Sequence, residues 1–203
     1  MVFKKKEKLS RREGVNLYLK GKRSYSDKAG IVRRPFKPGQ HGHKPTRLTV
    51  YGRQLREKQK VKRMYLMREK QFKRFFDMAL RIAQRTKEDK GHVFLQLLER
   101  KLDMVIYNAG LAKSKSTARQ MVVHGHVKVN GRRVKSPSYL VKEGDVIEVS
   151  EKVFEKLKRD YEGPAISEWL EVNGNKCVVK RYPTRDEISK DIDETLIVGW
   201  YTR

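Results

Sequence analysis

Residues 114–131 have the sequence SKSTARQMVVHGHVKVNG, which contains the signals that begin and end a helix and then turn a hairpin. Ser114 is a candidate N-cap, because its side-chain oxygen can accept from a free amide of the first helical turn. Gly125 is expected to stop that helix. The segment His126–Val129 then alternates polar and apolar residues, and Asn130-Gly131 is a strong signal for a two-residue β-turn. The stretch therefore predicts a helix followed directly by a β-hairpin.

The flanking sequence predicts a second helix and further strands. Apolar residues at helical spacing give Leu98–Ala109 one apolar face, and Gly110 is a candidate C-terminal cap. Val146–Val149 is expected to be a strand, as are residues 176–179, whereas residues 195–201 predict a strand or a packed tail. This half of the chain is thus expected to be a helix pair followed by a small sheet.

The N-terminal half has a different pattern. Residues 50–88 are expected to be helical, with an apolar stripe from Phe72 to Ala83. Residues 1–47 are rich in basic residues, proline and glycine, which predicts an extended arm with one short helix near Leu9–Leu19. Because such a segment holds few core residues, we expect it to be mobile in the free protein and to order on its partner.

These patterns predict an α+β fold in three parts. A basic extended arm, residues 1–47, precedes a mainly helical domain, residues 48–96, which residues 187–203 complete. A module of a helix pair and a small β-sheet, residues 97–186, is expected between these two segments.

Charge is the strongest functional signal. The 203 residues carry 49 Lys and Arg against 24 Asp and Glu, a net charge of +25. The excess is +21 in residues 1–97 and only +4 in residues 98–203. Nucleic acid is the expected partner, because neutralised phosphates release condensed counterions. A membrane would require a basic amphipathic anchor, which we do not find, so no membrane association is expected.

Two segments are candidates for phosphate contact. In Pro35–Gly42, proline presets the backbone, glycine permits close approach to phosphates, and Phe36 and His41 offer rings for base stacking. A surface loop with incidental charge is an equally open interpretation. The second candidate is a helix face bearing four cations, for which a solvated surface is the alternative. These cations are Arg53, Arg56, Lys60 and Arg63.

Catalytic and metal sites are not expected. His41/His43 and His124/His126 could ligate a metal, but cysteines and carboxylates are scarce near them. Cys177 is the single cysteine, so no disulfide can form within the chain, and a reducing, cytoplasmic location is expected. We therefore predict no catalytic residue, no cofactor and no metal.

Five segments, in order along the chain, resemble the bacterial ribosomal protein S4 family. They are Lys8–Gly14, Pro35–Gly42, Tyr51–Lys60, Leu98–Val149, which is similar to the RNA-binding module named after the family, and Leu196–Arg203. The chain resembles the form of the family that lacks the cysteines of an N-terminal zinc site.

This resemblance implies a non-enzymatic component of the small ribosomal subunit. It implies a primary binder of 16S rRNA that nucleates subunit assembly and contributes to translational accuracy. Implied neighbours are ribosomal protein S5 and mRNA on its path into the subunit, and in some members the mRNA of the protein's own operon. The RNA-binding residues expected from the motifs are Arg11, Arg12, Arg33, Arg34, Phe36, Pro38, Gly39, Gln40, His41, Gly42, Tyr51, Arg53, Gln54, Arg56, Lys58, Gln59, Lys60, Arg63, Lys113, Lys115, Arg119, Gln120, His124, Gly125 and His126.

Two other classes of function stay open. An RNA-modifying enzyme with an S4-type domain is one, because Arg100–Asp103 faintly resembles the catalytic segment of pseudouridine synthases. A surface acid on a helix is the favoured interpretation of Asp103. A DNA-binding regulator is the other, because a helix–turn–helix also occurs in repressors. A repressor, however, does not usually place a hairpin directly after its second helix.

Overall fold

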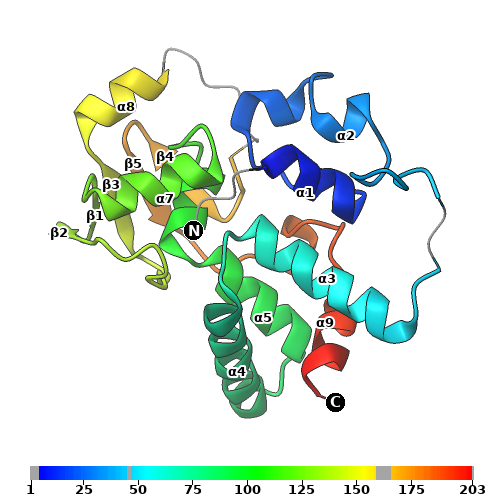
Figure 1. Ribbon diagram of the computed structural model, residues 1–203. Coiled ribbons are helices and arrows are strands. Elements are labelled where there is room, and N and C mark those ends of the chain that lie inside the picture. The colour runs from blue at the N-terminus through cyan, green and yellow to red at the C-terminus, as the bar shows by residue number, and fades with distance from the viewer. Residues whose placement is uncertain (1–4, 45–46, 159–165, 203) are drawn as a thin grey trace. The chain divides into compact units, whose positions relative to one another are not determined.

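The computed structural model describes residues 5–44, 47–158 and 166–202, and it has the predicted α+β fold (Figure 1). The chain forms two compact units. The first comprises Met1–Leu95 and Ser189–Arg203, and the second comprises Gln96–Ile188. Helix α5, Lys90–Glu99, contributes residues to both.

The first unit is helical. Its remaining elements are α1 (Lys6–Glu13), η1 (Gly21–Tyr25), α2 (Gly30–Arg33), α3 (Val50–Met64), α4 (Glu69–Thr86) and α9 (Glu194–Tyr201). The predicted apolar stripe of α4 is buried, and it includes Phe72 and Phe76. Both rings meet the Phe94 ring edge-on, with centroids 5.1 and 5.4 Å away. Aromatic packing of this kind gives the unit its core.

The N-terminal segment is folded where an extended arm is predicted. Leu17 and Leu19 are buried, and the Glu7 carboxylate accepts a hydrogen bond from the Gly30 amide at 2.6 Å. Sequence periodicity misses this part of the core because Leu17 and Leu19 lie in a segment without regular secondary structure. The prediction of a mostly extended arm is therefore wrong for residues 6–33. The first four residues and residues 45–46 of the predicted arm lie outside the described residues.

Of the two forms predicted for the C-terminal segment, a strand or a packed tail, the structure has the second, because the segment is a helix, α9, that packs on its own unit. Asp193 caps it, since its carboxylate accepts from the Thr195 amide at 3.0 Å. Ile197 is fully buried, and α9 packs against α3 within the first unit. Its β-branched residues favour a strand, but the cap and the packing surface of α3 favour the helix.

The second unit combines helices with an antiparallel sheet in the order β2-β1-β3-β5-β4. Its helices are α6 (Leu102–Asn108), α7 (Lys115–Val123), α8 (Glu151–Lys158) and η2 (Arg185–Glu187). Its strands are β1 (Val127–Val129), β2 (Arg132–Arg133), β3 (Val146–Val149), β4 (Leu170–Asn173) and β5 (Lys176–Val179). One face of the sheet shares a core with α6 and α7 that includes Ile106, Val122 and Trp169.

The predicted signals around residues 114–131 are confirmed. Ser114 accepts from the Thr117 amide at 3.2 Å, and Asn130 and Gly131 both have positive φ, as a two-residue hairpin turn requires. The predicted helix Leu98–Ala109, in contrast, is broken. Lys101 has extended backbone and forms a β-bridge with Leu140, so α5 ends before it and α6 begins after it.

Candidate nucleic-acid interface

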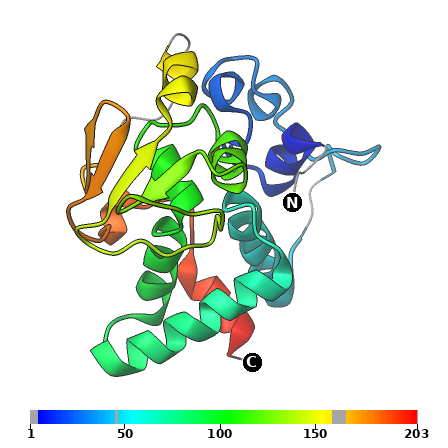
Figure 2. The same cartoon turned by 90° about the vertical axis from the view of Figure 1, so that its left-hand side faces the viewer.

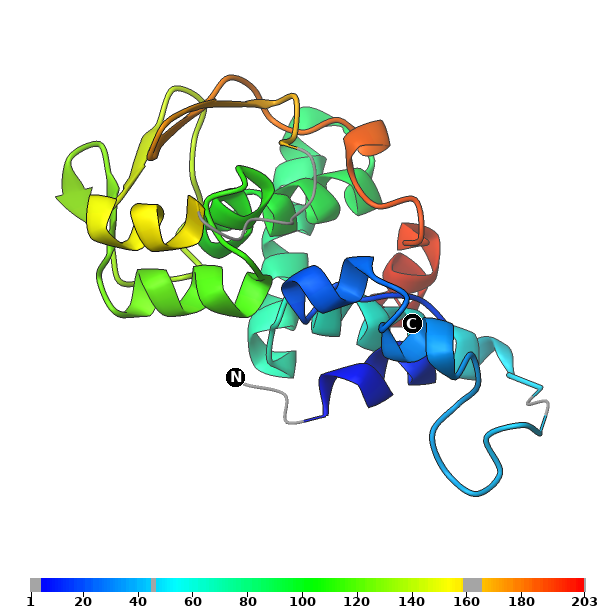
Figure 3. The same cartoon turned by 90° about the horizontal axis from the view of Figure 1, so that it is seen from above.

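The loop Pro35–Gly42 projects away from the helices of its own unit, as Figures 2 and 3 both show. Its two glycines are required by the backbone. Gly39 has a φ of +123°, and a Cβ at Gly42 would collide with the Lys37 carbonyl oxygen. Gln40 and His41 are exposed, and Pro38 is half-buried. The loop thus presents exposed polar groups on a backbone fixed by local sterics.

Phe36, a predicted stacking residue, already contacts two side chains of its own unit. The Arg11 guanidinium lies 5.0 Å from its ring centroid, and the His43 ring lies 3.8 Å away. Arg11 also donates from Nε to the carbonyl oxygens of Arg34 (3.1 Å) and Phe36 (3.0 Å). Arg11 and Phe36 therefore hold the loop, and His43 is a member of this site that sequence reasoning missed. A hollow of about 430 Å³ adjoins this packing.

Three basic residues near the loop remain exposed: Arg12 at the end of α1, and Arg33 and Arg34 at the end of α2. The Arg12 side chain stands in the lining of the same hollow, together with Lys44. Cations around a shaped hollow are suited to an anionic ligand such as a phosphate.

The predicted basic face of α3 is largely neutralised by other elements. Arg63 and Arg56 both pair with Glu13 of α1, whose side chain is only 1% exposed. Burial raises the pKa of Glu13, and Arg56 and Arg63 act against that rise. Lys60 pairs with Glu57 at 2.8 Å and donates to the Asp191 carbonyl oxygen.

Three of the four predicted phosphate contacts on this helix are therefore held by acids of their own unit. Glu13 comes from a distant part of the sequence, which helical spacing does not reveal. Arg53 is the exposed cation of the four, and Gln59 is half-buried on the same helix.

Two other predicted contact residues of α3 are packing residues. Lys58 is buried, with Nζ 2.6 Å from the Glu69 carboxylate and 4.4 Å from the Trp200 ring centroid. Gln54 is also buried, against Gly199 of α9. Tyr51 is half exposed, and its ring lies 4.8 Å from that of Trp200. The side of α3 that faces α9 is therefore an internal surface.

In the second unit, two cations that we predicted to contact RNA are likewise held by internal groups, and one of them is buried. Lys115 is 8% exposed, its Nζ lies 5.6 Å from the Tyr107 ring centroid, and burial lowers its pKa to about 8. Arg119 pairs with Asp103 at 3.2 Å, and Asp103 also pairs with the fully buried Lys101. Asp103 is thus a buried acid rather than a surface one. Of the other predicted residues here, Lys113 and Gly125 are half-buried, and Gln120, His124 and His126 are exposed.

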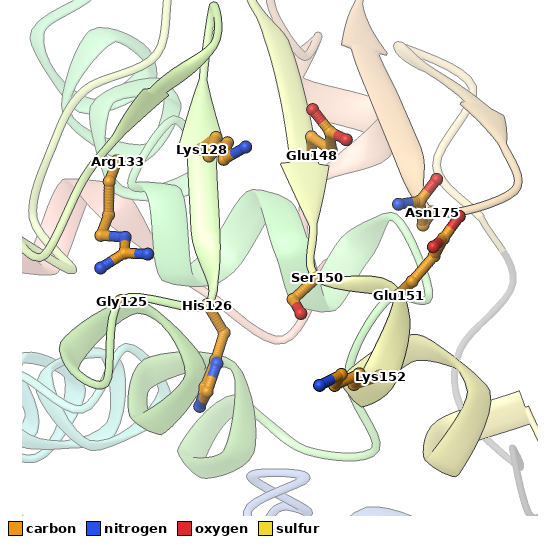
Figure 4. A pocket seen from close by; sticks show the side chains of 9 residues that line it. All are labelled: Gly125, His126, Lys128, Arg133, Glu148, Ser150, Glu151, Lys152 and Asn175. Atoms are coloured by element: carbon orange, nitrogen blue, oxygen red, sulfur yellow. The ribbon is translucent and has the colours of Figure 1, made fainter.

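A polar hollow of about 460 Å³ lies beside β1 and the start of α8 (Figure 4). It is lined by Gly125, His126, Lys128, Arg133, Glu148, Ser150, Glu151, Lys152 and Asn175. Lys128 and Arg133 are paired across the β1–β2 hairpin. Sequence reasoning missed both, although the alternation around Lys128 and the two-residue turn are sufficient to predict this pairing.

The other groups with possible chemical roles are the single cysteine and the potential metal ligands. Cys177 is buried, and burial raises the pKa of its thiol to about 12. Among the described residues, no three or more His, Cys, Asp or Glu side chains gather as a metal site. None of the helices in the described residues has the length and apolar character needed to cross a membrane.

Comparisons with known proteins cover nearly the whole chain. The model of the ribosomal protein S4/S9 N-terminal domain matches residues 2–99, and that of the S4 domain matches residues 100–147. The small ribosomal subunit protein uS4 of Halothermothrix orenii is 50% identical, over 97% of this chain and 96% of the relative. Protein uS4A of Alkaliphilus metalliredigens and uS4 of Petrotoga mobilis are each 48% identical, with the same coverage. The chain therefore belongs to the uS4 family of small ribosomal subunit proteins.

Proposed function

We propose that the chain is a non-catalytic component of the small ribosomal subunit that binds ribosomal RNA. The observation that carries this proposal is the 50% identity, over 97% of the chain, to a protein named small ribosomal subunit protein uS4. A net charge of +25 agrees with a polyanionic partner. The two alternatives, an RNA-modifying enzyme and a DNA-binding regulator, gain no support from these relatives.

The proposed partner is 16S rRNA, with the exposed residues of both units as contacts. In the first unit these are Arg12, Arg33, Arg34, Arg53 and the tip of the Pro35–Gly42 loop. In the second they are Gln120, His124 and His126, to which we add Lys128 and Arg133. Their exposed cations would place the protein on phosphates, and contacts to 2′-hydroxyls would select RNA over DNA. Binding would stabilise one fold of the RNA, which is how a protein without chemistry directs assembly and contributes to accurate translation.

Further neighbours are proposed from the family resemblance. They are ribosomal protein S5, mRNA on its path into the subunit, and the mRNA of the chain's own operon.

Competition between nucleic acids tests the proposal. The purified chain is bound to a labelled transcript of the 5′ domain of 16S rRNA and titrated with duplex DNA of random sequence, from an equal concentration upward. We expect the transcript to stay bound, because non-specific binding to duplex DNA is weak, with a dissociation constant of about 10⁻⁴–10⁻⁶ M. Displacement of the transcript by an equal concentration of duplex DNA would contradict the proposal.

A further inference from the structure

Helix α4 has an exposed basic face, and none of the RNA-contact residues predicted from the sequence lies on it. The helix has 18 residues and is therefore about 27 Å long. Its apolar side is buried in the core of the first unit. The opposite side exposes five cations and one acid, Asp77. The cations are Lys70, Lys73, Arg74, Arg81 and Arg85.

These cations differ from those of α3 because none of them forms an ion pair with an acid in the part of the chain that the structure describes. On α3, Arg56 and Arg63 pair with Glu13, and Lys58 pairs with Glu69. No ion pair joins any of the five α4 cations to an acid within residues 5–44, 47–158 and 166–202. Their charge is thus left for a ligand outside the first unit.

The shape of this face also suits a ligand. A hollow of about 520 Å³ runs beside it, lined by Lys70, Lys73, Arg74, Asp77, Met78 and Arg81. Lys70 and Arg81 are 11 residues apart, which places them about 16 Å apart along the helix axis. A straight row of cations of that length matches a regularly charged backbone better than it matches a single small anion.

We propose that this face of α4 binds the phosphate backbone of a double-helical RNA segment, an inference that rests on the proposed function. Single-stranded RNA is held by stacking its bases on exposed aromatic rings. The rings of α4, at Phe72, Phe75 and Phe76, are all buried. A membrane surface would need apolar anchors on the basic face, where Met78 is half-buried. Paired RNA, read by shape and backbone, is the partner that fits.

A four-site variant tests the proposal in the full-length chain. Lys70→Gln, Lys73→Gln, Arg74→Gln and Arg81→Gln together remove four positive charges. The matched control removes four from exposed lysines elsewhere, with Lys142→Gln, Lys156→Gln, Lys176→Gln and Lys190→Gln. Binding to the transcript of the 5′ domain of 16S rRNA is measured over a range of salt concentrations. Circular dichroism checks that both variants keep the wild-type melting temperature.

We expect the α4 variant to lower the slope of log affinity against log salt by about 3–4, since each phosphate contributes about 0.9 on duplex DNA. Its affinity near 150 mM salt should fall by about 10²–10³-fold, and that of the control should fall much less. Equal losses in both variants would show that net charge alone matters, and unchanged affinity in both would show that α4 makes no contact. Either result overturns the inference while the proposed function stands.

Footprinting on the same transcript identifies the kind of RNA. Backbone cleavage by hydroxyl radicals should show protections that the α4 variant loses, and these should lie in a base-paired stem. Lost protections confined to unpaired nucleotides would overturn the assignment to double-helical RNA. A wild-type chain that does not bind the transcript at all would instead overturn the proposed function, and the inference with it.

Discussion

At the residue scale, the second unit buries a cluster of acidic and basic side chains. Lys101 and Asp103 are both fully buried, and Arg119 completes the cluster from α7. Removing one member of a buried ion pair leaves an uncompensated charge, which costs about 3–5 kcal/mol. We expect Asp103→Asn to lower the free energy of unfolding by this amount in a urea titration. Glu155→Gln, at an exposed site on α8, is the matched control, and equal small losses in both variants would contradict the account.

The buried Lys115 predicts how the free energy of unfolding depends on pH. Burial lowers its pKa to about 8 in the folded chain from 10.5. Between these values the unfolded chain binds more protons than the folded one, so stability should rise with pH. Each pKa unit corresponds to about 1.4 kcal/mol, so the rise from pH 8 to 10 should be about 2–3 kcal/mol.

The control for this prediction is Lys115→Met, which lacks the amine and should show a smaller rise over the same range. The difference between the two chains removes the contributions of other groups, including Lys101, whose pKa burial also lowers. Denaturant titrations at pH 8, 9 and 10 measure this difference in the free energy of unfolding. Parallel stability curves for the two chains would show that Lys115 keeps its charge in the fold.

Local signals could be predicted from the sequence at this scale, and burial of charge could not. The Ser114 cap and the Asn130-Gly131 turn depend on neighbouring residues, so a short stretch is sufficient. The burial of Lys58 and Lys115 depends on Glu69, Trp200 and Tyr107, which come from other elements. Motifs and helical spacing therefore placed both lysines among the RNA-contact candidates but could not show that they are buried.

At the element scale, α1 is joined to α3 through Glu13. Arg56 and Arg63 both direct their guanidinium groups to its buried carboxylate. We expect Glu13→Gln to leave two partly buried cations without their counter-charge and to loosen α1. An unsatisfied group of this kind costs about 1–3 kcal/mol, which corresponds to roughly 5–150-fold faster exchange if α1 opens locally.

Hydrogen exchange on the free chain measures this effect. The amides of Leu9–Glu13 should be protected in the wild type and less protected in Glu13→Gln. Asp27→Asn, at an exposed acid of the same segment, should leave the protection unchanged. Random-coil exchange of α1 in the wild type would support the mobile arm that the sequence predicts instead of the packed segment in the structure.

Elements were predicted well where the helical spacing of side chains continues for several turns, as in α3 and α4. They were predicted poorly where tertiary packing decides which secondary structure a segment adopts. The segment Thr195–Tyr201 has the β-branched residues of a strand, yet its cap at Asp193 and the surface of α3 make it helical. The break at Lys101 depends on a bridge to Leu140, 39 positions later in the chain.

At the scale of the whole molecule, the net charge of +25 predicts strongly salt-dependent binding. If the chain contacts about 6–10 phosphates, affinity for the 16S rRNA transcript should fall about 10³–10⁵-fold between 50 and 200 mM salt, by analogy with duplex DNA. Filter binding at several salt concentrations measures the slope. A nearly flat dependence would mean that phosphates contribute little to the interface.

The central claim is that the chain is a component of the small ribosomal subunit. The most direct measurement is co-sedimentation of the chain, expressed in its own source cells, with ribosomal particles on a sucrose gradient. The particles are first washed with enough salt to remove loosely bound proteins, and the chain is then quantified by mass spectrometry. The account predicts the chain in the small-subunit peak, at about one copy per 16S rRNA. Recovery of the chain only in the free-protein fraction would contradict it.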